Sequence, residues 1–255
     1  KPGVILAGQN GPGATNLVTG IAQAAAAFSP VVSIAGSYST KDKVQDAFQG
    51  LDQQSLFKPI TKKTWTIKDK KKILLIGDST TGAVQVNVSD HFATIINERF
   101  PEYQVINTSI SGETTEGGIN RIEIALKTFN PELLILELGG NDGLRGFPPK
   151  LIKANLERII NTCKNNGTNV VLLGIRIPMN YGQRYTRTFE KIYREIAHEL
   201  SVPWIAFFMD GVAQNSNLMQ NDGIHPNAAA QPRLLENIWP AIQSIINKEK
   251  TLTTQ

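Results

Sequence analysis

Ile73-Leu74-Leu75-Ile76-Gly77-Asp78-Ser79 joins an uninterrupted apolar run to a glycine and two polar residues. A short apolar run that ends in a turn signal is typical of a strand buried on both faces. Similar runs recur along the following chain, at 103–108, 133–138, 169–175 and 204–208. The pattern therefore predicts five buried strands, the first of which ends just before Ser79.

Stretches with a helical spacing of apolar residues alternate with these runs. They predict helices over 92–100, 151–160, 189–200 and 227–247, the last disturbed by Pro232 and Pro240. Asn165-Asn166-Gly167 is a typical end for the second helix. Strands and helices in alternation form a parallel sheet covered by helices on both faces. We therefore predict a flavodoxin-like, three-layer α/β/α domain with a five-stranded parallel sheet over 73–250.

Four polar motifs follow predicted strands. They are Gly77-Asp78-Ser79, Ser111-Gly112-Glu113, Gly139-Gly140-Asn141-Asp142 and Asp222-Gly223-Ile224-His225. In parallel sheets of this kind, ligands bind outside the carboxyl ends of the strands. Each motif taken alone is better explained as a turn. The four together, each at a strand end, predict one dispersed hydrolase site.

The four motifs supply the parts of a serine hydrolase. Ser79, at an expected strand-to-helix turn whose amides point toward it, is a nucleophile that needs a neighbouring base. His225 is the only histidine in a motif that can supply this base, and Asp222 would orient its ring. Candidate donors to the oxyanion are the amides of Ser79 and Gly112 and the side-chain NH2 of Asn141.

The other titratable residues favour structural interpretations. Asp78 and Asp142 are interpreted as turn residues, and His91 and His198 as surface residues of helices. Cys163, the single cysteine, excludes an intrachain disulfide and is interpreted as a buried or half-buried thiol. Three histidines and one cysteine do not form a metal-ligand cluster, so we expect neither a metal nor a cofactor.

The charge is distributed unevenly. Residues 1–72 hold ten Lys and four Asp, about +6, and the remainder holds 16 Lys and Arg against 18 Asp and Glu, about −2. The basic run within 67–72 lacks the arginines and aromatic residues of a nucleic-acid patch, so we interpret it as a linker. No apolar stretch approaches the roughly 18 residues of a membrane span, and no secretion signal is visible.

Residues 1–66 differ from the rest of the chain in composition and in the pattern of their apolar residues. Val4–Ala7 and Val31–Gly36 are predicted strands, and the alanine-rich segment 14–28 between them is a predicted helix. The loop 11–16 is interpreted as a tight turn into this helix, although such a turn can also bind phosphate. We therefore expect an incomplete α/β fragment before the hydrolase domain.

This fragment resembles a known family. The stretches GPGATNLVTGIAQAAAAFSPVVSIAG and DAFQGLDQQSLFKPITK are similar to the pyrimidine-binding domain of thiamin-diphosphate enzymes of the acetolactate synthase type. The segments that carry the family's activating glutamate and its diphosphate-binding domain are missing, so thiamin-diphosphate catalysis is not expected. A partial sheet leaves apolar faces uncovered. We expect 1–66 to be poorly packed, to dock on the hydrolase, or to pair with another chain.

Residues 73–247 resemble the SGNH, or GDSL-type, hydrolases, and most closely the bacterial lysophospholipase, acyl-CoA thioesterase and arylesterase branch. The resemblance rests on ILLIGDS, INTSISGETTEGG, LLILELGGNDGLRGFPP, IRIPMNYGQRY and MQNDGIHPNAAAQP. It implies the roles given above for Ser79, Gly112, Asn141, Asp222 and His225. It also suggests a periplasmic or secreted protein, with the cytoplasm as the alternative.

One departure from the family lies directly after the nucleophile. The family usually continues Gly-Asp-Ser-Leu-Ser, whereas this chain has Thr80-Thr81. We expect these polar, β-branched residues to alter the first turn of the following helix or the wall of the pocket. The change removes no catalytic group.

Two loops, 143–149 and 178–185, follow the third and fourth strands and should flank the site. Their candidate substrate contacts are an apolar acyl groove and two cations for an anionic head group: Leu144, Phe147, Met179, Tyr181, Arg145 and Arg184. Loop packing explains each of them equally well.

The function predicted from the sequence is a serine esterase or thioesterase. It would hydrolyse acyl esters of the lysophospholipid, aryl ester or acyl-CoA type through an acyl-enzyme on Ser79. One alternative is a fragment of a thiamin-diphosphate-dependent lyase, which would decarboxylate pyruvate. The other is a non-catalytic lipid- or carbohydrate-binding relative, which a fluorophosphonate would not label.

Overall fold

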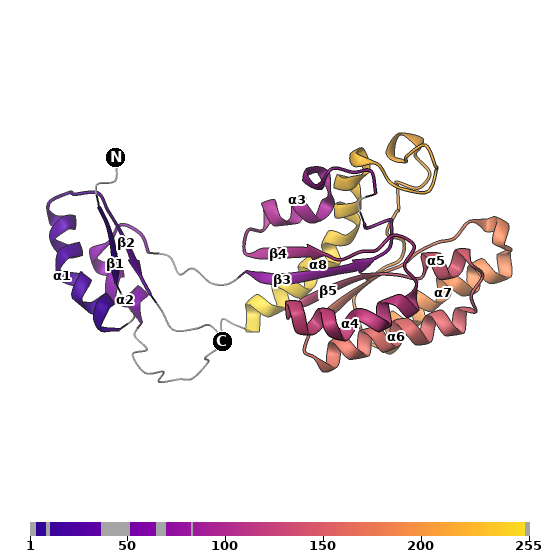
Figure 1. The fold of residues 1–255 in the computed structure, drawn as a ribbon, viewed down its shortest axis with the longest axis horizontal. Coiled ribbons are helices and arrows are strands. Elements are labelled where there is room, and N and C mark those ends of the chain that lie inside the picture. Colours follow the sequence, from indigo (N-terminus) through magenta and orange to yellow (C-terminus); the bar gives the residue numbers. More distant parts are fainter. Residues whose placement is uncertain (1–3, 9–10, 37–51, 65–69, 83, 253–255) are drawn as a thin grey trace. The chain divides into compact units, whose positions relative to one another are not determined.

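The computed structural model describes residues 4–8, 11–36, 52–64, 70–82 and 84–252 (Figure 1). The chain divides into two compact units, Lys1–Asp69 and Lys70–Gln255. Each unit has its own hydrophobic core.

The first unit is a small α/β fragment, as predicted. Its elements are β1 (Val4–Gly8), α1 (Pro12–Ala26), β2 (Val31–Ala35), α2 (Gln53–Phe57) and the 3-10 helix η1 (Lys58–Ile60). The two strands are parallel, and α1 connects them. The buried core consists of Ala14, Ile21 and Phe57, while Val32 and Ile34 on β2 are about half exposed. Two described strands and three buried side chains make a small core for an independent unit.

The second unit contains the predicted five-stranded parallel sheet. Its strands are β3 (Lys71–Gly77), β4 (Tyr103–Asn107), β5 (Leu133–Glu137), β6 (Asn169–Leu173) and β7 (Trp204–Ile205), in the order β4-β3-β5-β6-β7. This is the order of flavodoxin-like sheets, in which the strand order reverses beside the first strand. Lys71 and Lys72 belong to β3, so the strand begins inside the stretch predicted as linker.

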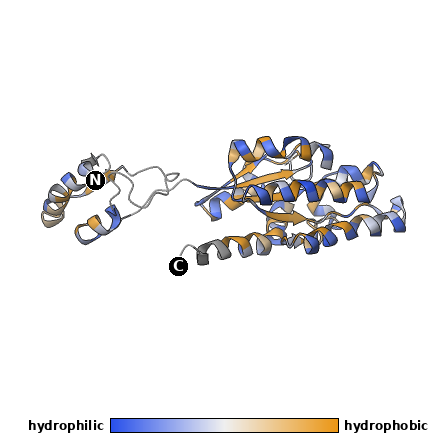
Figure 2. Ribbon diagram, turned by 90° about the horizontal axis from the view of Figure 1, so that it is seen from below, coloured by the Kyte–Doolittle hydropathy of each residue, from blue (hydrophilic) through white to orange (hydrophobic). Residues whose placement is uncertain are grey.

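Helices cover both faces of this sheet, which confirms the three-layer prediction (Figure 1). One face carries α4 (Thr115–Phe129), α6 (Pro149–Asn165) and α7 (Gln183–Glu199), and the other carries α3 (Phe92–Arg99) and α8 (Gln231–Leu252). Successive residues of a strand point to opposite faces. Leu74 and Ile76 therefore join the first core, and Ile73 and Leu75 the second. Figure 2 shows the apolar strands between amphipathic helices.

The helix α4 has no counterpart among the predicted helices. Gly117 and Gly118 lie in its first turns, and glycine lowers helix stability by about 1 kcal/mol relative to alanine. The structure gives the reason for Gly118: a Cβ there would lie 2.5 Å from Cδ1 of Leu138. Close packing against Leu138 thus requires glycine, which is a poor helix former. For this reason the sequence pattern did not predict α4.

The last helix begins later than predicted. Asn227 caps a 3-10 turn, η5 (Ala228–Ala230), by accepting from the backbone N–H of Ala230. α8 begins only at Gln231, so Pro232 falls in the first helical turn, where a missing N–H is tolerated. The predicted end of α6 is confirmed, since Gly167 after the helix has φ +75°. Within the described residues, none of these helices is both long and apolar enough to cross a membrane.

Candidate active site

Ser79 lies on a turn at the carboxyl end of β3. The prediction of a helix starting here is wrong, because turns cover 79–82 and the first α-helix among the described residues of this unit is α3. The N–H of Thr80 donates to Oδ1 of Asp78 at 2.8 Å, a bond that closes an Asx turn and competes with a helical ladder.

Gly77 is required by the packing beneath this turn. Oγ1 of Thr81 hydrogen-bonds Oε2 of Glu137 at 3.2 Å and the hydroxyl of Ser109 at 3.0 Å. A Cβ on residue 77 would lie 2.0 Å from the Thr81 Oγ1 and 2.8 Å from the Glu137 Oε2. Only glycine lets the chain turn against the neighbouring strand at this point.

Ser79, His225 and Asp222 form one unbroken chain of hydrogen bonds. Nε2 of His225 lies 2.8 Å from Oγ of Ser79, and Nδ1 lies 2.7 Å from Oδ2 of Asp222. Oδ1 of Asp222 accepts from the backbone N–H groups of Ile224 and His225, at 2.9 and 3.0 Å. These bonds, that of the imidazole first, lower the pKa of Asp222 to about 2. The ionised carboxylate keeps the proton on Nδ1, so Nε2 can accept the serine proton.

Gln220, which was not among the predicted site residues, connects the His225 loop to the Ser79 loop. Its side-chain NH2 donates to the carbonyl of Val84 at 2.7 Å and to that of Pro226 at 3.0 Å. Its backbone N–H donates to the carbonyl of His225 at 2.8 Å. A single side chain thereby links segments more than 130 positions apart in the sequence.

The structure also brings the two other oxyanion candidates to the carboxyl edge of the sheet. Gly112 has φ +77° in the loop after β4, and Asn141 lies in the short helix α5 (Gly140–Leu144) after β5. Nδ2 of Asn141 donates to Oδ2 of Asp78 at 3.0 Å. Arg145 donates to the carbonyl oxygen of Gly112 at 3.2 Å, which joins the Gly112 loop to the end of α5.

Arg121 on α4 holds both ends of the Gly112 loop. Its guanidinium forms a bidentate ion pair with Glu113 after Gly112, and donates to the hydroxyl of Thr108 before it at 3.0 Å. Arg121 was not among the predicted site residues. Glu113 was visible as part of a motif, but its partner lies eight residues further on in a helix that was not predicted.

The structure agrees with the predictions for three other titratable residues and corrects the prediction for His91. Asp142 accepts from the N–H and hydroxyl of Thr115 at 2.9 and 2.6 Å, which is the expected structural role. His198 is exposed and Cys163 is fully buried, also as expected. His91 was predicted to lie at the surface and is buried instead, at 3% exposure.

His91 is buried because both of its ring nitrogens have backbone partners. Nδ1 accepts from the N–H of Ala93 and caps α3, and Nε2 lies 3.1 Å from the carbonyl oxygen of Thr81. A ring with Nδ1 as acceptor is neutral and donates through Nε2. Burial lowers the pKa of His91 from 6.5 to about 4. The neutral ring thus supports the turn that carries Ser79.

A pH-dependent loss of stability is expected from His91. The unfolded chain binds a proton below pH 6.5 and the folded chain only near pH 4, so stability is complete above 6.5 and is lost as the pH falls toward 4. The difference amounts to about 3 kcal/mol. His91→Asn keeps a cap for α3 but does not titrate. Urea unfolding between pH 7 and 4 should show the advantage of the parent over this variant shrinking by about that amount; parallel curves would contradict it.

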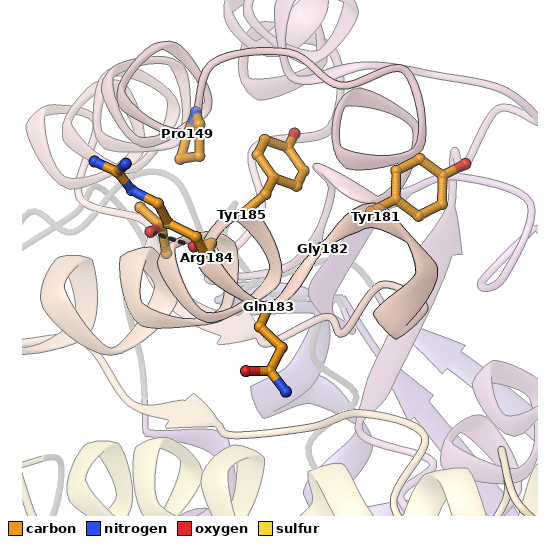
Figure 3. Close-up of a pocket in the computed structure, with 7 residues that line it drawn as sticks. Pro149, Tyr181, Gly182, Gln183, Arg184 and Tyr185 are labelled. Carbon is orange, nitrogen blue, oxygen red and sulfur yellow. Dashed lines mark hydrogen bonds between the residues drawn. The ribbon is translucent and has the colours of Figure 1, made fainter.

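The candidate substrate residues do not form one cavity. Leu144, Met179 and Tyr181 are 39%, 58% and 39% exposed, Phe147 packs partly against the core, and Arg145 bonds to Gly112. A cavity of about 460 Å³ lies at the start of α7, lined by Pro149, Tyr181, Gly182, Gln183, Arg184, Tyr185 and Thr188. Figure 3 shows the rings of Tyr181 and Tyr185 at this cavity, with Gln183 pointing away from them.

The predicted loops are shorter than expected at both places. Leu144 ends α5 and Pro149 begins α6, while Met179–Tyr181 form the 3-10 helix η3 and α7 begins at Gln183. Of the six candidates, Tyr181 and Arg184 line this cavity and the other four do not. Within the described ranges, no group of three or more His, Cys, Asp or Glu side chains could hold a metal ion.

Two different groups of known proteins match the chain. The first unit is matched over residues 1–56 by the family model for the thiamine pyrophosphate enzyme, N-terminal TPP binding domain. A probable acetolactate synthase large subunit of Methanocaldococcus jannaschii is 53% identical over 64 residues, which is 25% of this chain but only 11% of that protein. The match therefore concerns a small piece of such enzymes.

The second unit is similar to bacterial esterases. Esterase TesA of Pseudomonas aeruginosa is 40% identical over 178 residues, which is 68% of this chain and 89% of that protein. Thioesterase 1/protease 1/lysophospholipase L1 of Escherichia coli is 37% identical over 69% of this chain and 86% of that protein. The crystal structure of psychrotrophic esterase EstA from Pseudoalteromonas sp., inhibited by monoethylphosphonate, is 33% identical, with a TM-score of 0.66 over 70% of this chain and all of that chain.

The family assignment rests on the larger part of the molecule. The family model described as GDSL-like Lipase/Acylhydrolase matches residues 75–232, more than half of the chain. The match begins inside β3 and ends in α8, and so includes Ser79, Gly112, Asn141, Asp222 and His225. Sequence, fold and site geometry agree, and the chain belongs to the GDSL-like lipase/acylhydrolase family.

Proposed function

We propose that the chain hydrolyses acyl esters and thioesters through an acyl-enzyme on Ser79. The coarser statement follows from the family and its relatives: the chain is a carboxylic ester hydrolase of the SGNH type. The observation that best supports the mechanism is the hydrogen-bonded chain from Asp222 through His225 to Ser79.

The proposed reaction has two halves. Nε2 of His225 removes the proton from Oγ of Ser79 as the oxygen attacks the carbonyl carbon, and Asp222 stabilises the imidazolium. The tetrahedral oxyanion accepts from the amides of Ser79 and Gly112 and from Nδ2 of Asn141. The imidazolium then protonates the departing alcohol or thiol. Water, deprotonated by His225, attacks the acyl-enzyme and releases the acid.

The proposed substrate has an apolar acyl chain. Leu144 and Met179 expose apolar side chains on the segments after β5 and β6, and we propose that they receive the acyl chain with Phe147 and Tyr181. Arg145 and Arg184 are the proposed cations for an anionic head group, and Arg184 lines the cavity at the start of α7. Names such as thioesterase and lysophospholipase among the relatives support this class.

The first unit is proposed to contribute no catalytic group. The match covers only 11% of the acetolactate synthase large subunit of Methanocaldococcus jannaschii, and the catalytic candidates all lie in the second unit. The half-exposed Val32 and Ile34 support the proposal that another chain covers this face of β2.

Labelling by an alkyl fluorophosphonate tests the proposed nucleophile. The reagent should add one phosphonyl group to the parent protein, on the peptide that contains Ser79, because an activated serine attacks phosphorus as it attacks a carbonyl. Intact mass and peptide mass spectrometry measure this. Ser79→Ala should remain unlabelled and Ser111→Ala should be labelled like the parent. A label on any other residue would refute the assignment.

A further inference from the structure

Two buried carboxyl groups lie behind Asn141. Asp78 is 4% exposed and Glu137, the last residue of β5, is 2% exposed. Among the ion pairs of the described residues, neither has a lysine or arginine partner. Two neighbouring carboxylates without a cation do not both ionise in a buried place, so a proton is retained between them.

Glu137 holds this proton. Burial, followed by the neighbouring Asp78 carboxylate, raises the pKa of Glu137 well above its ordinary value. Oε2 of Glu137 accepts from the backbone N–H of Asp78 and from the hydroxyl of Thr81, both at 3.2 Å. A neutral acid at Glu137 leaves the Asp78 side chain as an acceptor for its neighbours.

Asp78 in turn orients the side-chain amide of Asn141. Its Oδ1 accepts from the N–H of Thr80 at 2.8 Å, and its Oδ2 accepts from Nδ2 of Asn141 at 3.0 Å. A carboxylate only accepts hydrogen bonds, so the Asn141 amide must turn its NH2 toward Asp78. One N–H is used in this way and the second is left for a substrate. A flipped amide would set Oδ1 against the carboxylate.

We propose that Glu137 and Asp78 are positioning residues, which fix the Asn141 amide so that it presents an N–H, and not its oxygen, to the oxyanion. The inference rests on the proposed function, in which Asn141 stabilises the oxyanion. Neither carboxyl group needs to touch the substrate. The effect proposed here acts through Asn141, and it is separate from the bonds by which Asp78 and Glu137 also support the turn that carries Ser79.

The surrounding backbone leaves room for this pair. A Cβ on Gly140 would lie 3.1 Å from Oδ2 of Asp78, and one on Gly77 would lie 2.8 Å from Oε2 of Glu137. Both glycines belong to the motifs that carry Ser79 and Asn141. Each thus leaves space for a carboxyl oxygen beside the site.

A double-mutant cycle between Asp78 and Asn141 tests the proposal. In Asp78→Asn, the new amide oxygen still accepts from Thr80, but its NH2 faces Asn141 and favours the flipped amide. We expect kcat for a chromogenic acyl ester to fall about 100- to 1,000-fold, as for the loss of one oxyanion donor, with KM nearly unchanged. Asn141→Ala should cost the same. Adding Asp78→Asn to Asn141→Ala should then lower kcat no further.

The control is Asp142→Asn, since Asp142 is an equally buried neighbour that contacts Thr115 and not Asn141. Its effect on kcat should be the same in the parent and in Asn141→Ala. Additive losses for Asp78→Asn and Asn141→Ala would overturn the proposal, because a general structural role adds to the loss of the donor. Thermal unfolding of each variant accompanies the kinetics.

Glu137 is tested by a conservative and a disruptive variant. Glu137→Gln stays neutral and keeps an oxygen that accepts from the Asp78 N–H and the Thr81 hydroxyl, so kcat should stay within about threefold of the parent value. Glu137→Leu removes this acceptor and should lower kcat at least as much as Asp78→Asn does, with a smaller loss in Asn141→Ala because the part that acts through Asn141 is already gone. Equal losses in Gln and Leu variants would overturn the part played by Glu137. Turnover that survives in Ser79→Ala would instead refute the proposed function, which separates the two failures.

Discussion

Ser79→Ala is expected to lower kcat for a short chromogenic acyl ester by roughly 100,000-fold or more. The substitution removes the only atom that would form the acyl-enzyme, whereas the oxyanion donors and the binding groups remain. Initial rates at saturating substrate measure the loss. The parent protein and Ser111→Ala, which changes a serine of another motif, serve as active controls.

The fold should survive this substitution. Ser79 is partly exposed on a turn, and its hydroxyl bonds to His225, while the turn itself is held by Asp78 and Thr81. The thermal midpoint of Ser79→Ala should therefore stay close to that of the parent. Residual turnover near the parent value, in a folded protein, would exclude Ser79 as the nucleophile.

His225→Ala supplies a second arm of this experiment. Members of one catalytic unit give strongly non-additive losses, because a serine without its base and a base without its serine are equally ineffective. Ser79→Ala with His225→Ala should be about as inactive as either single variant. A product of two independent losses would mean that the two side chains do not act in one step.

Asp222→Asn is expected to lower kcat by about 10,000-fold through the tautomer of His225. Oδ1 of Asp222 accepts from two backbone N–H groups, so an asparagine here keeps its oxygen on that side and turns its NH2 toward the ring. Nδ1 must then accept, and the ring proton moves to Nε2. An imidazole protonated at Nε2 cannot receive the proton of Ser79.

Nitrogen chemical shifts of His225 measure this change of tautomer alongside kcat. Asp210→Asn, which alters an exposed aspartate on the loop after β7, is the matched control and should leave both unchanged. The pKa of Asp222 is about 2, so its carboxylate stays ionised at any pH used for the assay. An Asp222→Asn protein with normal kcat and an Nδ1 proton would contradict the role assigned to the carboxylate.

The main elements of the fold could be predicted from local pattern. Apolar runs such as 73–77 read as strands because both faces are buried, and the glycine after α6 marked the helix end. Alternation of strands and helices then indicated a parallel sheet. The predictions of helices failed where a residue was selected for tertiary packing and not for helix formation. Gly118 weakens the helical pattern of α4 because the helix packs closely on Leu138.

The candidate catalytic residues could be predicted from the sequence, but the residues that support them could not. Placement at strand ends led to Ser79, Gly112, Asn141 and the Asp222/His225 pair, because parallel strands deliver their carboxyl ends to one edge. Their supporting partners were not predictable in this way. Arg121 lies on α4, a helix that was not predicted. His91 was predicted to lie at the surface, because the backbone partners of its ring nitrogens are visible only in the tertiary structure.

The amino-acid sequence by itself determined the family, the polar motifs that follow the predicted strands and the identity of the candidate catalytic side chains. The tertiary structure alone decided which of these groups touch. His225 and Ser79 are 146 positions apart, and Glu137 and Asp78 are 59 positions apart. Periodicity encodes what each segment is, because it depends on neighbouring residues. Contact between distant segments depends on strand register and side-chain packing, which no local pattern contains.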